Sequence, residues 1–278
     1  MKEYILETKN LSFKYEDGTN ALNNINLKIE KGKKVAFLGV NGAGKSTLFL
    51  NFNGILKPSS GEILYKGEKI KYTHSYLNEL RKNIGIVFQD PDNQLFSANV
   101  YQEVSFGAMN LDLKDKEVIN RVDNALKDVN MYEYKDKAVH FLSYGQKKRV
   151  SIADILVMEP EIIIFDEPTS SLDPKHSKQI VQIFNKINEA GITVIVSTHD
   201  VEIAYSWADY IIVMKNGEVV KKGDPIEVFK DNNFLKDAYL EKPIVLDIYE
   251  NLVQKGYIKA SNNIPRDKEE LIKILDYK

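Results

Sequence analysis

The sequence has 278 residues, of which 43% are hydrophobic, so it is long enough for one large domain or two modest ones with a real core. Its 38 basic residues nearly balance 40 acidic ones, which disfavours a protein that holds nucleic acid over a broad basic surface. The lack of cysteine excludes disulfides and thiolate metal sites and fits a reducing cytosolic setting. Neither a secretory signal nor an apolar run of the roughly 20 residues that span a membrane is found, so we expect any membrane function to need partner subunits.

The amino-terminal part predicts an antiparallel β subdomain. Leu11, Phe13 and Tyr15 alternate with polar residues, Asp17-Gly18 favours a turn, and apolar residues recur between Leu22 and Ile29.

Five short apolar runs farther along the chain predict buried strands, at 35–39, 84–88, 161–167, 193–199 and 210–214. Helical patterns lie between most of them. Strands that are buried on both faces and joined through helices indicate an α/β fold with a mainly parallel sheet, and its ligand site is expected at the carboxyl ends of the strands.

Two helical regions accompany this predicted sheet. Residues 98–159 contain three successive helical patterns, which predict an inserted helical subdomain. After Gly223-Asp224-Pro225 the chain becomes more polar and apolar residues recur at helical spacing. We therefore predict a main domain at 1–224 and a small helical carboxyl-terminal extension at 225–278.

The segment GVNGAGKST, residues 39–47, matches a phosphate-binding loop between a predicted strand and a helix. Its glycines let backbone amides point at phosphates, Lys45 supplies a cation for the β- and γ-oxygens, and the Ser46 hydroxyl is a ligand for Mg²⁺. A glycine-rich turn without a ligand would require all these features to coincide by chance. The residues expected to bind nucleotide here are Gly39, Asn41, Gly42, Ala43, Gly44, Lys45, Ser46 and Thr47.

A second strand, IIIFDEP at 162–168, ends in two adjacent carboxylates, an arrangement that is costly unless a cation relieves the repulsion. Because side chains alternate along a strand, we expect Asp166 to hold Mg²⁺ and Glu167 to polarise the attacking water. The alternative is an ordinary acidic helix start before Pro168.

Gln89 and His199 follow two other predicted strands, so their side chains are expected at the same edge of the sheet. Structural hydrogen bonding is the usual role of such residues, but beside a phosphate loop we assign Gln89 to Mg²⁺ or water and His199 to the γ-phosphate. Tyr15 fits a nucleobase-stacking position and a sheet face equally well.

The stretch HFLSYGQKKRV, residues 140–150, predicts a helix that begins at Ser143, since Ser143 and Gln146 have the spacing of a capping box. Gly145 permits close approach of a phosphate, and three cations follow it. A capped surface helix is the plain alternative. With a phosphate loop elsewhere in the chain, a nucleotide held between two copies arranged head to tail becomes the better interpretation.

In this combination the motifs GVNGAGKST, Gln89, LSYGQ, IIIFDEP, SSLD ending at Asp173, and His199 resemble an ABC-transporter ATPase subunit over residues 1 to about 224. The resemblance implies that ATP is held between the phosphate loop of one subunit and the LSYGQ helix of the other. It further implies that Ser143, Gly145 and Gln146 contact this ATP in trans, that the Asp173 loop crosses the dimer interface, and that Tyr15 stacks on adenine.

A narrower resemblance, carried by GIVFQDPDNQLF at 85–96, LSYGQKKRV and the extra carboxyl-terminal segment, is to the ATPases of energy-coupling-factor transporters, particularly the cobalt/nickel branch. It implies an ATPase dimer, with itself or with a paralogous subunit, on the cytoplasmic face of a membrane. A membrane coupling subunit and a substrate-binding membrane subunit are the implied partners. Asp90, Asp92 and Gln94 lie where coupling helices dock in that group, and acids there could pair with an arginine. A capped surface turn at Asp90-Pro91 is the alternative.

The leading hypothesis is thus an ATP-hydrolysing, transport-coupled subunit that drives uptake of a metal ion or vitamin. A soluble ABC ATPase that acts as an assembly switch without transport is the alternative, but such proteins resemble fused cassettes or carry a long coiled coil. Tyr144 departs from the usual LSGGQ pattern. It is expected to point away from the phosphate, toward the helical subdomain or the facing subunit, so that Tyr144→Gly leaves ATP hydrolysis broadly intact.

Overall fold

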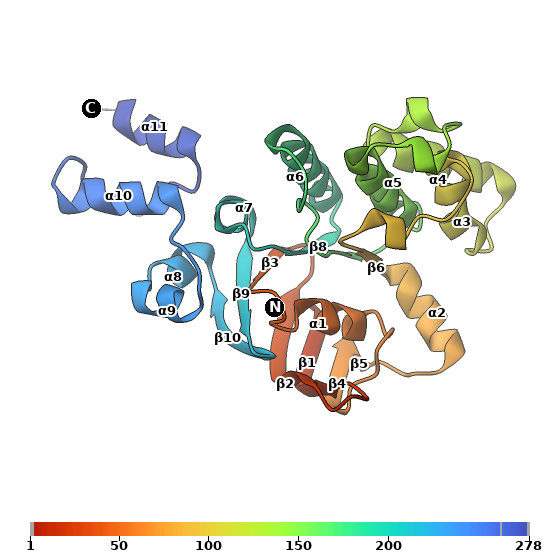
Figure 1. Cartoon of the computed structure of the whole chain (residues 1–278), viewed down its shortest axis with the longest axis horizontal. Helices are drawn as coiled ribbons and strands as arrows, with labels where there is room; N and C mark the ends of the chain where they lie inside the picture. Colours follow the sequence, from red (N-terminus) through yellow and green to blue (C-terminus); the bar gives the residue numbers. More distant parts are fainter. Residues whose placement is uncertain (1–2, 262, 277–278) are drawn as a thin grey trace.

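The computed structural model describes residues 3–261 and 263–276 (Figure 1). A four-stranded antiparallel sheet of order β2-β1-β4-β5 lies at the amino-terminal side and confirms the predicted β subdomain. Its strands are β1 (Tyr4–Lys14), β2 (Asn20–Glu30), β4 (Ser60–Tyr65) and β5 (Glu68–Lys69). The last two strands were not expected, because β4 is short and begins with exposed, polar positions.

A six-stranded sheet of order β10-β9-β3-β8-β7-β6 forms the centre of the molecule. The five apolar runs are its parallel strands, and an antiparallel hairpin adds the edge strand that the sequence did not reveal. The strands are β3 (Lys34–Leu38), β6 (Ile84–Val87), β7 (Ile162–Phe165), β8 (Thr193–Ser197), β9 (Tyr210–Lys215) and β10 (Glu218–Gly223). The α/β class with a mainly parallel sheet is confirmed.

Both faces of the central sheet are covered, so its side chains alternate between two cores. Val35 and Phe37 face a cluster shared with the antiparallel sheet and α1 (Lys45–Phe52). Ala36 and Leu38 face a second cluster, shared with α6 (Pro174–Glu189) and α7 (Val201–Trp207). Figure 1 shows α1 and these two helices on opposite sides of the sheet. Burial on both faces explains why the strands read as continuous apolar runs.

The predicted helical subdomain consists of α3 (Val100–Met109), α4 (Asp115–Asp128) and α5 (Tyr144–Leu156). It lies beside α2 (His74–Asn83) and the β6 edge of the sheet (Figure 1). A segment with a short 3-10 turn, η1 (Pro91–Asn93), connects β6 to the subdomain.

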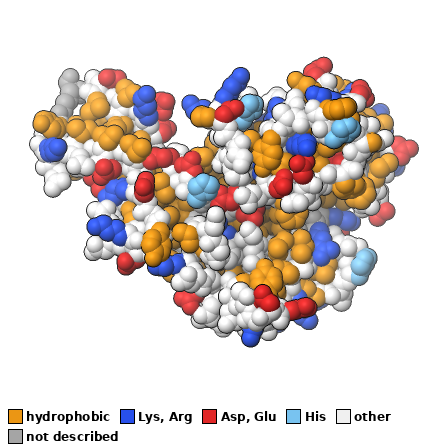
Figure 2. All heavy atoms as spheres, in the orientation of Figure 1, with side chains coloured by type: hydrophobic (Ala, Val, Ile, Leu, Met, Phe, Trp, Pro, Cys, Tyr) orange, Lys and Arg blue, Asp and Glu red, His pale blue; other side chains and the backbone are white. Residues whose placement is uncertain are grey.

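The carboxyl-terminal extension contains α8 (Pro225–Phe229), α9 (Asn232–Asp237), α10 (Ile244–Gln254) and α11 (Lys268–Asp276). The first two helices share the main core, as does Leu246 of α10, whereas the rest of α10 packs with α11 around a separate small cluster. Figure 2 shows a row of hydrophobic side chains along α10, and Ile244 and Ile248 are exposed there. Among the described helices, none is long and apolar enough to cross a bilayer.

Gly85 makes the closest contact between the central sheet and α5. A Cβ atom added there would lie 2.2 Å from Cγ2 of Ile155, and its backbone does not have positive φ. Gly85→Ala is therefore expected to lower the free energy of unfolding by about 1–3 kcal/mol through overpacking, measured by urea denaturation. Gly223→Ala is the control, because its added Cβ would lie 3.4 Å from a flexible carboxylate. Equal stabilities of the two variants would contradict the tight contact.

Candidate nucleotide-hydrolysis site

The loop between β3 and α1 requires glycine at two positions. Gly39 has φ 147 and Gly44 has φ 100, values that residues with a side chain rarely adopt. An added Cβ would lie 2.3 Å from the Met214 carbonyl oxygen at Gly39, and 2.7 Å from the Ala21 carbonyl oxygen at Gly44. The loop thus wraps closely against the neighbouring backbone and leads into the amino terminus of α1, where free amides favour an anion.

Lys45, the first residue of α1, is buried beside the acidic end of β7. Its Nζ donates a hydrogen bond to the Gly39 carbonyl at 2.6 Å and lies 3.7 Å from Glu167 Oε1. The ammonium group therefore lies between the phosphate loop and a buried carboxylate, where it can also contact phosphate oxygens.

Asp166 and Glu167 point in different directions, as expected, but strand alternation is not the reason, because both residues lie beyond the end of β7. Strand β7 ends at Phe165, and Glu167 has a left-handed backbone with φ 45. The Ser197 hydroxyl donates to Asp166 Oδ1 at 2.6 Å and accepts from the Glu167 backbone N–H at 2.9 Å. The turn after the strand, and not the strand pleat, gives the two carboxylates different surroundings.

Glu167 has one carboxylate oxygen that is hydrogen-bonded and one that is not. Oε2 lies 2.9 Å from His199 Nδ1, whereas Oε1 is buried, has no hydrogen-bond partner within the described part of the chain, and lies 3.7 Å from the Lys45 ammonium. A buried carboxylate oxygen is costly when no donor binds it, and the ion pair with Lys45 offsets part of this cost. The expected proximity of Glu167, His199 and Lys45 is therefore present, and Oε1 can still accept a hydrogen bond from a water.

A cavity of about 320 Å³ collects most of the predicted nucleotide contacts. It is lined by Tyr15, Gln89, the loop from Asn41 to Thr47, and both Asp166 and Glu167. Tyr15 lies just beyond the end of β1 and is 38% exposed, and its hydroxyl is 2.9 Å from Thr47 Oγ1. Its ring is thus presented to the cavity, although its edge also contacts Phe13.

The donor set in this cavity fits Mg²⁺ with a nucleotide. Ser46 supplies a hydroxyl oxygen and Asp166 a carboxylate oxygen. Gln89 and Glu167 line the same cavity, and Oε1 of Glu167 has no hydrogen-bond partner among the described residues. The described residues contain no cluster of three acidic, histidine or cysteine side chains that would hold a metal alone. Phosphate oxygens would complete the shell, and the ion would neutralise their charge.

A second set of predicted contacts lies together elsewhere, and we call Ser143, Gly145, Gln146 and Asp173 the second half-site. The capping box is present, with Gln146 N donating to Ser143 Oγ at 3.3 Å and Ser143 N donating to Gln146 Oε1 at 3.0 Å. A Cβ on Gly145 would lie 3.3 Å from the His176 ring, and His176 Nδ1 is 2.7 Å from Asp173 Oδ2. The amino ends of α5 and α6 therefore stand side by side.

Asp173 caps α6 by accepting from the His176 backbone N–H at 2.9 Å. This backbone hydrogen bond, followed by the side-chain bond to His176, lowers the pKa of Asp173. Within the described residues, no member of the second half-site lines the phosphate-loop cavity. The second half-site is thus spatially separate from the phosphate-loop cavity of the same chain.

Tyr144 points in a direction that the sequence did not predict. Its hydroxyl donates to the Gln89 backbone carbonyl of the same chain at 3.2 Å, and not to the helical subdomain or outward to a facing subunit. At the first position of α5 the side chain leans back toward the preceding turn, which brings it to the segment after β6. Burial first, and then Asp90 and Asp92, raise the pKa of this phenol.

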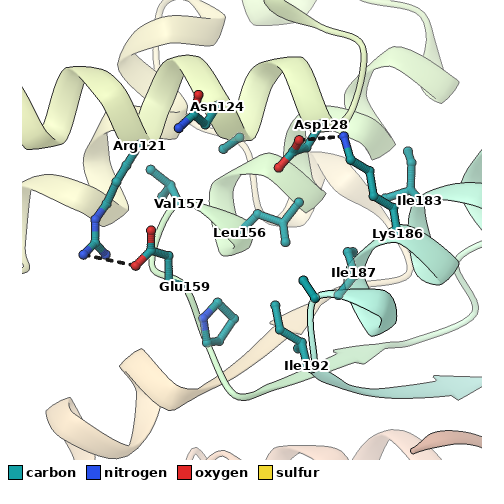
Figure 3. Close-up of a pocket in the computed structure, with 13 residues that line it drawn as sticks. Arg121, Asn124, Asp128, Leu156, Val157, Glu159, Ile183, Lys186, Ile187 and Ile192 are labelled. Atoms are coloured by element: carbon teal, nitrogen blue, oxygen red, sulfur yellow. Dashed lines mark hydrogen bonds and ion pairs between the residues drawn. The ribbon is translucent and has the colours of Figure 1, made fainter. Parts of the chain in front are cut away.

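A further cavity, of about 420 Å³, lies between α4, the end of α5 and α6 (Figure 3). It is bordered by the ion pairs Arg121–Glu159 at 3.1 Å and Lys186–Asp128 at 2.7 Å. No phosphate-loop residue lines it, so it is not part of the nucleotide site. The pair that joins α4 to α6 is well exposed, and such pairs contribute roughly 0–1 kcal/mol.

The fold and this geometry define a P-loop nucleotide hydrolase. The family profile described as ABC transporter matches residues 22–170. The chain belongs to the ABC transporter ATP-binding family, and it is an ABC-type ATPase.

Related sequences match this chain over most of its length. It is 50% identical to "Energy-coupling factor transporter ATP-binding protein EcfA3" of Clostridium perfringens, covering 93% of this chain and 91% of the relative. It is 48% identical to a "Putative ABC transporter ATP-binding protein" of Methanosarcina mazei over 98% of this chain, and spans 60% of that longer relative.

Solved structures of ABC-transporter ATP-binding proteins also match most of this chain. The structure of cbiO1 from Clostridium perfringens, described as part of the ABC transporter complex cbiONQ, matches with a TM-score of 0.78 and 49% identity over 91% of this chain and 100% of that one. The dimeric post-hydrolysis structure of the ATP-binding cassette MJ0796 with ADP and Pi matches with a TM-score of 0.73 and 32% identity, over 79% of this chain and 98% of that one.

Two side chains near the site escaped the sequence reasoning. Ser197 binds the Asp166 carboxylate and the backbone N–H of Glu167, yet a serine at the end of an apolar strand resembles many others; only its place two residues before His199 could have indicated a role. Lys148 was counted as one of three cations in a row, but it is buried against the segment that contains Gln89. Its burial could not be read from a run of charges.

Glu167→Gln is expected to reduce ATP turnover by about 10²–10⁴-fold, because the amide cannot accept a proton from water. ATP binding should persist, since Lys45 and the loop are untouched; a fluorescent ATP analogue and a phosphate-release assay measure the two quantities. Glu161→Gln is the matched control, because Glu161 precedes the opposite end of β7 and pairs with Lys66. A normal turnover rate in Glu167→Gln would show that the base is another group.

Proposed function

We propose that this chain is the ATP-hydrolysing, energy-coupling subunit of an energy-coupling-factor type ABC transporter. It works at the cytoplasmic face of a cell membrane and powers import of a transition-metal ion such as cobalt or nickel, or of a vitamin. The names of its close relatives support the transporter type. The observation that carries the proposal is a large open groove beside the Gln89 segment, in the place where a membrane partner would attach.

This docking groove has a volume of about 890 Å³ and lies between α2, β6, α3 and α5. Phe96 and Phe106 line it and are 68% and 53% exposed, with their rings edge to face at 5.0 Å. Exposed aromatic residues in a groove of this size are typical of a surface that receives an apolar helix from a partner. The proposed occupant is a coupling helix of the integral membrane subunit.

Acidic groups accompany the apolar surface and suggest a cationic residue on the partner helix. Gln94 donates to Asp154 Oδ2 at 3.1 Å on the groove wall, and burial raises the pKa of Asp154 to about 7. An arginine from the partner would favour its charged form. Asp90 caps η1 by accepting a hydrogen bond from the Asp92 backbone N–H, so the capped surface turn considered above as the alternative to a docking role is present. Asp92 forms an ion pair with Lys147 at 2.6 Å.

The separation of the second half-site from the phosphate-loop cavity supports a head-to-tail dimer, either with a second copy or with a paralogous ATPase. The phosphate-loop cavity of one subunit would receive Ser143, Gly145 and Gln146 of the other, and the Asp173 loop would lie at the interface. MJ0796, which shares the fold, forms a dimer with ADP and Pi. Closure around ATP and reopening after hydrolysis would then move the docking grooves that hold the membrane subunits.

Within this arrangement the side chains of the site have distinct tasks. Lys45 and the loop amides hold the β- and γ-phosphates, while Ser46, Asp166 and Gln89 would hold Mg²⁺ and its water. Glu167 accepts the proton of the attacking water through its open Oε1, and His199, bonded to Oε2, orients this carboxylate and contacts the γ-phosphate. Tyr15 stacks on the adenine ring. Transport needs a further membrane subunit that binds the substrate, so the cargo is selected outside this chain.

Asp92→Arg is expected to weaken binding of the membrane coupling subunit by at least about tenfold, because it reverses a charge directly next to Asn93 on the groove wall and repels an incoming cation. Co-purification of the tagged ATPase with its membrane partners, followed by surface plasmon resonance, measures the loss. Asp231→Arg is the matched control, since Asp231 is a similarly exposed acid that pairs with Lys221 at 3.0 Å in the extension. Unchanged binding in Asp92→Arg would contradict this docking surface.

The assembly tests the function itself. Tagged protein purified from its native membrane should carry two hydrophobic subunits, and its ATP turnover should rise when they are reconstituted in vesicles. Recovery of the protein with ribosomes and without membrane subunits would instead favour the assembly-switch alternative.

A further inference from the structure

The first turn and a half of α5 holds the segment that contains Gln89 through three side chains. Lys148 Nζ donates to the carbonyls of Phe88, at 3.4 Å, and Gln89. The Tyr144 hydroxyl donates to the same Gln89 carbonyl at 3.2 Å. Lys147 binds Asp92 at 2.6 Å. Each of these contacts joins the helical subdomain to the connecting segment after β6.

Lys148 is an unusual participant because its side chain is buried, with 1% of the residue exposed. Burial lowers the pKa of its ammonium to about 8, against the attraction of Asp166, Asp90 and Glu167. None of the described carboxylates forms an ion pair with it within 4.0 Å, so the carbonyls of Phe88 and Gln89 are its direct partners. A buried cation is costly, and an apolar residue would fill the same space with less penalty.

We propose that Lys148, assisted by Tyr144, is a positioning residue for ATP hydrolysis: it fixes the Gln89 carbonyl and so places the Gln89 side chain in the nucleotide cavity. The inference rests on the role proposed above for Gln89. Since Gln89 lines that cavity and Lys148 does not, Lys148 acts through Gln89 and not on the nucleotide.

The same contacts give α5 a second consequence. Its amino end carries Ser143 and Gly145, which would bind the ATP of the facing subunit, while its next turn holds Gln89 beside the chain's own ATP. In the proposed dimer the same helix would thus serve two nucleotides. The subdomain that carries it shares the main buried cluster with α6, beside the exposed pair Lys186–Asp128 (Figure 3).

Lys148→Met tests the positioning role in the purified full-length dimer. It keeps the stem and removes the donor, and we expect kcat to fall about tenfold, equivalent to about 1.4 kcal/mol of transition-state stabilisation, with KM for ATP changed less than about twofold. Lys148→Gln retains a donor and should recover part of the rate. Tyr144→Phe, which removes only a hydroxyl, should lose about two- to threefold. This replaces the expectation that Tyr144 is dispensable.

Lys242→Met is the matched control, because Lys242 is largely buried and pairs with Glu250 in the extension, away from the site. It should retain the normal rate. Thermal unfolding of each variant separates a folding defect from a catalytic one, and Tyr144→Phe preserves the test if Lys148→Met does not fold. Normal kcat in Lys148→Met would overturn the proposal, and where that variant does not fold, normal kcat in Tyr144→Phe would do so.

The double variant Gln89→Ala/Lys148→Met gives the sharpest readout. If Lys148 acts through Gln89, the double variant should be no slower than Gln89→Ala alone, whereas a merely structural lysine would give multiplied losses. Multiplied losses would therefore overturn the positioning role. A normal rate in Gln89→Ala would overturn the role of Gln89 itself. A slow Gln89→Ala with a normal Lys148→Met would overturn only the present inference.

Discussion

Two neighbouring buried carboxylates, Asp166 and Glu167, set the electrostatic constraint on which the rest of the site depends. Their repulsion in a poorly solvated place must be offset by cations and hydrogen-bond donors. The protein supplies Lys45 at 3.7 Å, the Ser197 hydroxyl and His199, with Lys148 attracting both acids from farther away. One oxygen of Glu167 still lacks a hydrogen-bond partner among the described residues. A magnesium ion and a polarised water are the groups that would complete this balance.

The central sheet brings these groups together because the ends of its parallel strands are in register. Strand β8 lies between β3 and β7, with Phe37 opposite Ser197 and Val196 opposite Phe165. The residues that follow each strand therefore meet at one edge, as open α/β sheets require. Because Glu167 has a left-handed backbone, its carboxylate points toward Lys45, whereas the Asp166 carboxylate accepts a hydrogen bond from Ser197. Local backbone strain of this kind, about 1–3 kcal/mol, is maintained by the surrounding structure and is concentrated at functional sites.

Much of this arrangement follows from the sequence, because the strong signals are local. The phosphate loop, the capping box at Ser143 and the buried strands each depend on a few adjacent residues and are present in the structure. The short edge strands β5 and β10 were missed, since exposed positions leave little apolar pattern. The direction of Tyr144 and the burial of Lys148 were also missed, because both are set by contacts with a segment about 55 to 60 residues earlier in the chain. The roles of the individual site residues remain predictions.

The geometry of α5 would let one helix serve two nucleotides in the proposed dimer. Tyr144, Lys147 and Lys148 stand at positions i, i+3 and i+4 and so share the face that contacts the Gln89 segment. Gly145 lies on a different face, against Leu172 and His176 beside the capped start of α6. A hydrogen-bonded helix transmits displacement along and across its axis with little distortion. In the proposed dimer, the ATP of the facing subunit and the chain's own Gln89 would therefore contact different faces of the same helical turn, and hydrolysis at each site would depend on both subunits.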